Sequence, residues 1–132
     1  MHRLRDLIGV PFVAGGRDPK VGLDCLGMVR IAVKRLKNAE VSKDYLEESS
    51  TEDILNFRTR SMEDWEPISE PEIGCAVAMR LDPERPDFAQ HLGVYIGEGY
   101  ILHTIKKMGV HRISINDPYF HGKIEGFYRW KK

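Results

Sequence analysis

The chain has 132 residues, of which 42% are hydrophobic and 30% charged, as is usual for one globular domain with a single core. Its 20 basic and 20 acidic residues give a formal net charge of zero, which gives no support for nucleic acid or a membrane surface as partner. No run of about 18 apolar residues occurs, which excludes a membrane-spanning helix, and the N-terminus lacks a signal peptide's apolar core, so we expect synthesis in the cytoplasm.

The first part of the chain predicts a short helix, an irregular loop and a long helix. Residues 3–8 are expected to form the short helix, which Pro11 prevents from continuing. Glycines and prolines make residues 12–19 irregular. Residues 25–37 predict an amphipathic helix because apolar residues recur there at spacings of three and four.

Acidic residues are concentrated in the middle of the chain. Residues 40–72 hold eleven of the twenty, which indicates a solvated, variable insertion at about 38–72 in a single domain spanning 1–132. A recognition surface is the alternative. Within this insertion residues 50–53 resemble a helix start, and Pro67 and Pro71 indicate an extended passage.

From residue 73 onward the pattern changes to short strands joined by turns. Five strands are predicted, at residues 75–80, 91–96, 100–104, 110–115 and 124–130. Residues 81–90 are expected to be a polar loop, and residues 97–99 a tight turn. Helices followed by an antiparallel sheet of about five strands indicate an α+β fold.

The residues that suggest chemistry are one cysteine and two distant histidines. Cys25 lies at a helix start, where free N–H groups and the dipole favour a thiolate, and Asp24 is its expected N-cap. The backbone N–H of Cys25 is a candidate oxyanion donor. His91 and His103 are twelve residues apart across a predicted hairpin, so their rings are expected on one sheet face. This order is typical of a thiol nucleophile, its base and an orienting group.

Each of these residues also has an ordinary structural interpretation. A lone cysteine is more often a small core residue, as we expect for Cys75, and a lone histidine is more often structural. A metal site formed by Cys25, His91 and His103 is disfavoured because no two ligands are closely spaced, so we expect neither metal nor cofactor. The other histidines have no identifiable partner and are interpreted as surface residues: His2, His111 and His121.

Four motifs in this order resemble the NlpC/P60 family of cysteine peptidases. They are residues 9–16, 22–29, 91–97 and 102–103. The resemblance implies a papain-like α+β fold and hydrolysis of peptide bonds in bacterial cell-wall stem peptides, often those that involve D-glutamate or diaminopimelate. It implies that Cys25 is the nucleophile, His91 the base and His103 the orienting polar group.

Three further residues are candidates for the oxyanion site or the substrate pocket, namely Asp24, Phe12 and Gly93. Many members of the family have a tyrosine where Phe12 stands. Because a phenylalanine ring cannot donate a hydrogen bond, we expect Phe12 to reduce activity.

The motif from Asp24 to Gly27, with Leu26 in place of serine, resembles a branch of the family found in tail proteins of long-tailed phages and gene transfer agents. Resemblance to that branch implies that the protein lies at the virion tail tip. It also implies tail-hub or tail-tip proteins as partners and stem peptides as substrate. The alternatives are a structural tail assembly protein with weak or lost activity, a secreted antibacterial amidase, and a deamidase or acyltransferase.

Overall fold

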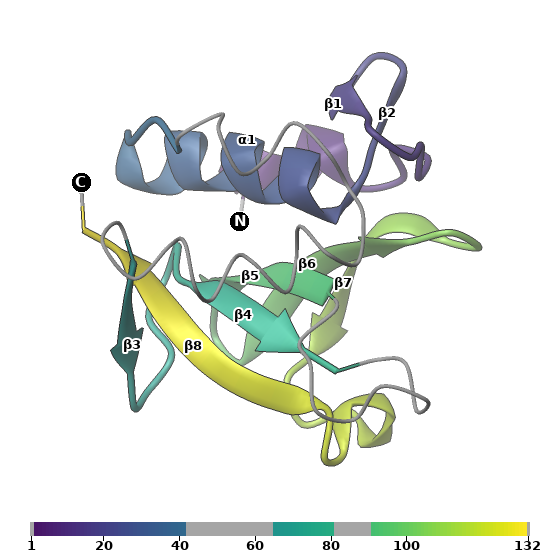
Figure 1. The fold of residues 1–132 in the computed structure, drawn as a ribbon. Helices are drawn as coiled ribbons and strands as arrows, with labels where there is room; N and C mark the ends of the chain where they lie inside the picture. The colour runs from purple at the N-terminus through teal and green to yellow at the C-terminus, as the bar shows by residue number, and fades with distance from the viewer. Residues whose placement is uncertain (1, 42–64, 81–90, 132) are drawn as a thin grey trace.

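The computed structural model describes residues 2–41, 65–80 and 91–131. The helix start expected at 50–53, the polar loop expected at 81–90 and most of the acidic insertion lie outside these residues. Within them, one α-helix lies across a six-stranded antiparallel sheet, and a small two-stranded sheet stands at the N-terminal end of that helix (Figure 1).

The long helix, α1, spans Cys25–Lys37 and confirms the predicted range. Asp24 caps its N-terminus by accepting a hydrogen bond from the Gly27 N–H. Asn38 ends it in the left-handed conformation, with its N–H bonded to the Lys34 carbonyl. The short helix near the N-terminus, η1 (His2–Leu7), is a 3₁₀-helix that begins one residue before its predicted start.

Within the part of the chain that the structure describes, the main sheet has six strands where about five were expected. They are β3 (Trp65–Ile68), β4 (Ala76–Met79), β5 (His91–Gly97), β6 (Tyr100–Ile105), β7 (Gly109–Ser114) and β8 (Ile124–Trp130), in the order β3-β8-β4-β5-β6-β7. Five confirm predicted strands within about one residue at each end. The additional strand, β3, contains Pro67 and pairs only with β8 at the sheet edge, where a residue without an N–H is tolerated.

The expected N-terminal helices are confirmed in part, because α1 is the only α-helix among the described residues and η1 is a 3₁₀-helix. The chain between η1 and α1 instead forms a two-stranded antiparallel hairpin of β1 (Arg17–Asp18) and β2 (Gly22–Leu23). Phe12 makes a parallel bridge to Leu23 and so holds the preceding loop against this hairpin. Strands of two residues are too short to produce an alternating pattern in the sequence.

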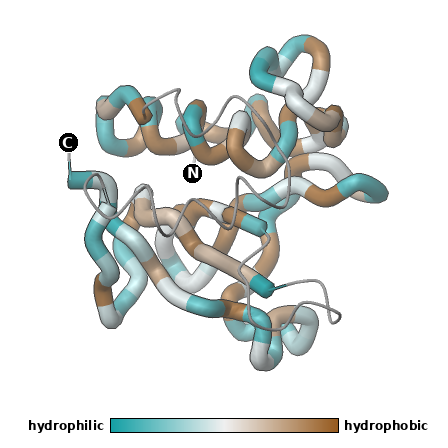
Figure 2. Tube along the Cα trace, viewed as in Figure 1, coloured by the Kyte–Doolittle hydropathy of each residue, from teal (hydrophilic) through white to brown (hydrophobic). Residues whose placement is uncertain are grey.

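Two hydrophobic clusters hold the sheet. The larger one lies between α1 and one sheet face and includes Leu26 and Leu92, both completely buried. The smaller one lies on the other face, where Phe120 of the 3₁₀-helix η3 (Pro118–Phe120) packs with Met79 and Ile101. Figure 2 shows hydrophobic positions where α1 and the strands face each other. Among the described residues, none forms a helix long and apolar enough to cross a membrane.

Candidate active site

Cys25 is the first residue of α1, and the residue before it fixes where that helix begins. The Asp24 carboxylate accepts hydrogen bonds from the Gly27 N–H at 2.8 Å, the Gly15 N–H at 3.0 Å and the Arg17 guanidinium at 2.7 Å. Only 1% of Asp24 is exposed, so its carboxylate oxygens accept hydrogen bonds from within the protein. Asp24 thus joins the start of α1 to the loop before β1 and positions Cys25.

Gly27 allows this loop to approach the helix. A Cβ atom at residue 27 would lie 2.2 Å from the Gly16 carbonyl oxygen, a backbone atom that cannot move without shifting the loop. The same carbonyl accepts the N–H of Asp24 at 3.3 Å. The first turn of α1 and the loop before β1, which we call the glycine loop, are therefore in direct backbone contact. This contact explains the glycine two residues after the cysteine.

The Cys25 thiol is neutral in the free protein. Burial raises its pKa to about 12, and this effect outweighs the N–H groups of Leu92 and Leu26, which lower it. The expectation that the helix start would favour a thiolate is therefore wrong for the free protein. The contact with the Leu92 N–H places the sulfur beside β5, next to His91 in the chain.

His91 and His103 lie together, as their even spacing predicted. His91 begins β5 and His103 lies within β6, and the His91 Nε2 and His103 Nδ1 atoms are 2.9 Å apart. Their rings meet edge to face, with centroids 5.1 Å apart. His103 is fully buried and 8% of His91 is exposed. Among the described residues, the Nδ1 atom of His91 has no hydrogen-bond partner, so it is available to a reacting group.

His111 joins this pair, so its interpretation as a surface residue without a partner was wrong. It lies in β7 directly opposite His103, and the Nε2 atoms of the two rings are 2.9 Å apart. Its Nδ1 lies 3.0 Å from the Gly109 carbonyl oxygen. We refer to His91, His103 and His111 as the histidine network. Counting outward from the β6–β7 turn could have found this member, because residues 103 and 111 are equally far from residue 107.

Both inner histidines are held neutral. Burial, followed by the charge of His111, lowers the pKa of His91 to about 4. Burial, followed by the charges of His91 and His111, lowers the pKa of His103 to about 3. At neutral pH the site therefore combines a neutral thiol with neutral imidazoles, which suits general-base catalysis.

Backbone N–H groups at the start of α1 complete the arrangement. The N–H of Gly27 is bonded to the Asp24 side chain and that of Met28 to the Asp24 carbonyl. Among the described residues, the N–H of Cys25 has no hydrogen-bonded acceptor, whereas that of Leu26 contacts the Cys25 sulfur. An unpaired donor beside the sulfur is suited to the oxyanion that forms on a substrate carbonyl oxygen.

The remaining pocket candidates occupy different positions. Phe12 is half-buried and lies beside β2, which leads directly into Asp24 and Cys25. A Cβ at Gly93 would lie 2.9 Å from both the Ile101 and Met79 side chains, so Gly93 faces the smaller cluster and permits close packing. The Asp24 carboxylate is already hydrogen-bonded to Gly27, Gly15 and Arg17.

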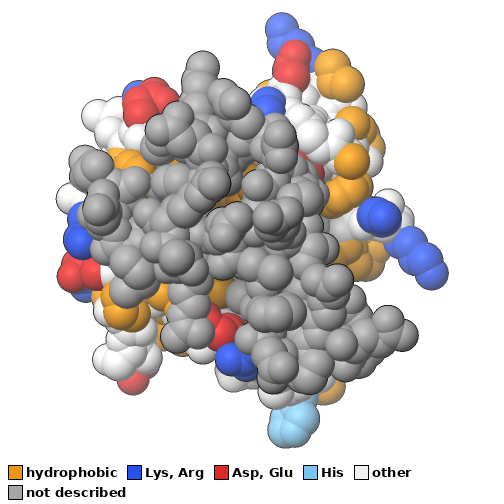
Figure 3. All heavy atoms as spheres, viewed as in Figure 1, with side chains coloured by type: hydrophobic (Ala, Val, Ile, Leu, Met, Phe, Trp, Pro, Cys, Tyr) orange, Lys and Arg blue, Asp and Glu red, His pale blue; other side chains and the backbone are white. Residues whose placement is uncertain are grey.

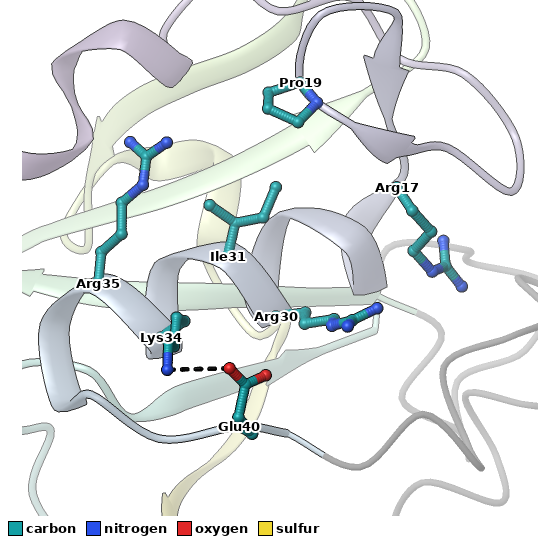
Figure 4. Close-up of a pocket in the computed structure, with 7 residues that line it drawn as sticks. All are labelled: Arg17, Pro19, Arg30, Ile31, Lys34, Arg35 and Glu40. Atoms are coloured by element: carbon teal, nitrogen blue, oxygen red, sulfur yellow. Dashed lines mark ion pairs between the residues drawn. The ribbon is translucent and has the colours of Figure 1, made fainter.

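A separate cavity of about 340 Å³ lies on the outer side of α1 (Figure 4). Basic side chains line it, but Lys34 pairs with Glu40 at 2.9 Å and Arg35 with Asp6 at 2.6 Å. Figure 3 shows a different surface feature on the right-hand margin, where hydrophobic side chains gather beside basic ones. The cavity on the outer side of α1 includes no member of the histidine network.

Comparison with known proteins identifies the family to which this arrangement is related. The model of the NlpC/P60 family matches residues 9–129, nearly the whole chain. Two curated relatives come from Escherichia coli K12. One, named probable endopeptidase YafL, is 23% identical over 98% of this chain and 48% of its own length. The other, named murein DD-endopeptidase MepH, is 27% identical over 79% of this chain and 34% of its own length.

Solved structures share the same fold. NlpC2 from Trichomonas vaginalis superposes with a TM-score of 0.71 at 19% identity, covering 98% of this chain and 45% of that protein. The chain spans less than half the length of each of these three proteins. The common part holds the helix and the sheet described above.

Proposed function

This chain belongs to the NlpC/P60 family, and we propose that it is a cysteine endopeptidase that hydrolyses amide bonds in peptidoglycan stem peptides. The observation that carries the proposal is a cysteine at a helix start, beside the strand whose first residue is a hydrogen-bonded histidine. The names of YafL and MepH, both endopeptidases, support the reaction, and the name of MepH supports murein as the substrate.

The reaction follows from the neutral state of the site. The Cys25 sulfur attacks the amide carbonyl carbon while its proton moves to Nδ1 of His91. The carbonyl oxygen becomes an oxyanion that accepts a hydrogen bond from the Cys25 N–H. When the C–N bond breaks, His91 returns the proton to the leaving amine. His91 then takes a proton from water as the water oxygen attacks the thioester carbon. The C–S bond breaks, the acid is released and His91 returns the proton to the sulfur of Cys25.

His103 supports this cycle by holding the His91 ring. When His91 carries the thiol proton, its Nε2–H can donate to His103 Nδ1, 2.9 Å away. That bond orients the ring and stabilises the imidazolium, as the third group of a catalytic triad does. The absence of a tyrosine hydroxyl at Phe12 lowers the rate that we expect, because one hydrogen-bond donor is missing beside the nucleophile.

The test is digestion of purified peptidoglycan and of a synthetic stem peptide, followed by mass spectrometry of the products. The wild-type chain should release peptide fragments, and Cys25→Ala should release none. Cys75→Ala is the matched control, because Cys75 is also a buried cysteine but lies just before β4, outside the site. Equal product formation by Cys25→Ala and the wild type would contradict the proposal. The masses identify the bond that is cleaved.

We also propose that the chain acts at the tail tip of a phage or phage-like particle, with tail-hub proteins as partners, after synthesis in the cytoplasm. This rests on the resemblance of the Asp24-Cys25-Leu26-Gly27 motif to that branch of the family. Leu26 is completely buried in the larger cluster, so its role is packing. Purified tail particles should contain the chain by mass spectrometry, and its recovery only from other fractions would contradict this placement. If particles contain it but the wild-type chain shows no detectable hydrolysis, a structural tail role replaces the enzymatic one.

A further inference from the structure

Each ring nitrogen in the outer part of the histidine network has a defined partner, and one end of the network is a backbone carbonyl. That carbonyl, on Gly109, can only accept a hydrogen bond. His111 Nδ1 lies 3.0 Å from it and must therefore carry a proton. When all three rings are neutral, the positions of the other ring protons follow from this one contact.

The assignment proceeds one ring at a time for neutral imidazoles. With its proton on Nδ1, His111 has a bare Nε2, which accepts from His103 Nε2–H at 2.9 Å. His103 then has a bare Nδ1, which accepts from His91 Nε2–H, also at 2.9 Å. His91 is left with a bare Nδ1. A bare Nδ1 on His91 is what a general base for Cys25 requires.

We propose that His111, anchored by the Gly109 carbonyl, is a positioning residue that fixes the tautomers of His103 and His91 and so makes His91 a base. The inference rests on the proposed endopeptidase function for its catalytic meaning. His111 acts through His103 and does not touch the substrate. The network ends on a backbone carbonyl where many histidine-dependent sites end on a carboxylate.

The anchor itself is rigidly held. Gly109 has a φ of +68°, and a Cβ there would lie 2.4 Å from the Val10 carbonyl oxygen. The neighbouring Val110 donates its N–H to Val10 at 2.9 Å and accepts from Gly9 at 2.8 Å. The Gly109 carbonyl is thus held between the β6–β7 turn and the N-terminal loop. Phe120 also packs against His103 in an edge-to-face contact, with ring centroids 5.6 Å apart.

Two substitutions separate the tautomer effect from simple packing. His111→Phe keeps an aromatic ring but removes the acceptor, so His103 can place its proton on Nδ1 and force His91 to do the same. His111→Gln can keep an acceptor oxygen near the position of Nε2. His121→Phe is the matched control, because His121 is an exposed histidine outside the network.

The first measurement is nitrogen-15 NMR of the histidine rings in the full chain at neutral pH, where His91 and His103 are neutral. We expect the wild type to carry protons on Nε2 of His91 and His103 and on Nδ1 of His111. His111→Phe should move the proton of His91 to Nδ1, and His111→Gln should not. A wild-type spectrum with the Nδ1–H tautomer at His91 would overturn the inference whether or not the chain is a peptidase.

The second measurement is the hydrolysis of a stem peptide. His111→Phe should lower kcat by about 10- to 100-fold with little change in KM, as loss of an outer hydrogen-bond partner does elsewhere. His111→Gln and His121→Phe should keep most of the wild-type rate. If His111→Phe keeps full kcat while Cys25→Ala is inactive, the inference fails and the proposed function stands. If His111→Phe does not fold, the wild-type spectrum and the His111→Gln variant still decide.

Discussion

At the scale of single residues, the site is built for a neutral resting state. Burial raises the pKa of Cys25 to about 12 and lowers that of His91 to about 4, so neither group is charged at neutral pH. A preformed thiolate–imidazolium pair would need the opposite shifts. In the mechanism that we propose, the proton therefore moves only when a substrate carbonyl is in place.

The reactivity of Cys25 tests this state. In the folded protein at pH 7, iodoacetamide should modify Cys25 at least about tenfold more slowly than in the denatured chain, and the rate should rise as the pH increases towards 12. Mass spectrometry of the peptide that contains Cys25 measures this rate, with the Cys75 peptide resolved separately. Fast modification of Cys25 between pH 6 and 7 would show that the thiolate already exists.

The sequence predicts three of the four residues that we place in the candidate site. Cys25, His91 and His103 follow from a helix start and an even spacing across a hairpin. The sequence does not predict the role of His111, because that role depends on the register of β6 with β7. The turn between these strands has none of the residue pairs that define such a register. The directions of the pKa shifts could not be predicted from the sequence, because burial is a property of the packed fold.

At the scale of elements, the first turn of α1 is in close contact with the glycine loop. A glycine-to-alanine substitution in this turn should therefore change the free energy of unfolding in the direction opposite to the usual one. Alanine normally stabilises a helix relative to glycine by about 1 kcal/mol. Gly27→Ala should instead lower the free energy of unfolding by about 1–3 kcal/mol, because its Cβ would overlap the Gly16 carbonyl oxygen.

Urea denaturation followed by circular dichroism measures this change in stability. Lys34→Ala, on the exposed face of the same helix, is the control and should change stability little, because its ion pair with Glu40 is on the surface. A more stable Gly27→Ala variant would mean that the loop can withdraw from α1 without loss.

The elements themselves were predictable where one face is apolar over many residues. Helix α1 and five of the six strands fall within about one residue of their expected bounds for this reason. Strand β3 could not be predicted, because Pro67 argues against a strand until its place at the sheet edge is known. The pairing of the short strands β1 and β2 likewise depends on contacts that are remote in the sequence.

At the scale of the whole molecule, the buried neutral histidines make the fold sensitive to acid. Their folded pKa values, about 4 for His91 and about 3 for His103, lie below the ordinary value of 6.5. The stability that they contribute is complete above pH 6.5 and is lost as the pH falls from there through the folded values. The free energy of unfolding should therefore decrease from about pH 6.5 downward.

Urea midpoints between pH 6.5 and 5 isolate this effect, because Asp6 and Glu72 have pKa values below the ordinary 3.8 and 4.5 and titrate at lower pH. His103→Gln, which cannot titrate, should flatten the slope in this interval. A wild-type stability that stays constant from pH 6.5 to 5 would contradict the assignment of neutral, buried rings.

The backbone contact between Gly9 and Val110 has a consequence for biosynthesis. The ribosome makes the helix that carries Cys25 before it makes β6 and β7. Those two strands carry His103, His111 and the Val110 carbonyl that binds the N-terminal loop, and they come about 100 positions after Gly9. A nascent chain that stops at β5 has Cys25 but neither His103 nor the Gly109 carbonyl. The arrangement that we propose as catalytic is therefore complete only after β7 has been synthesised.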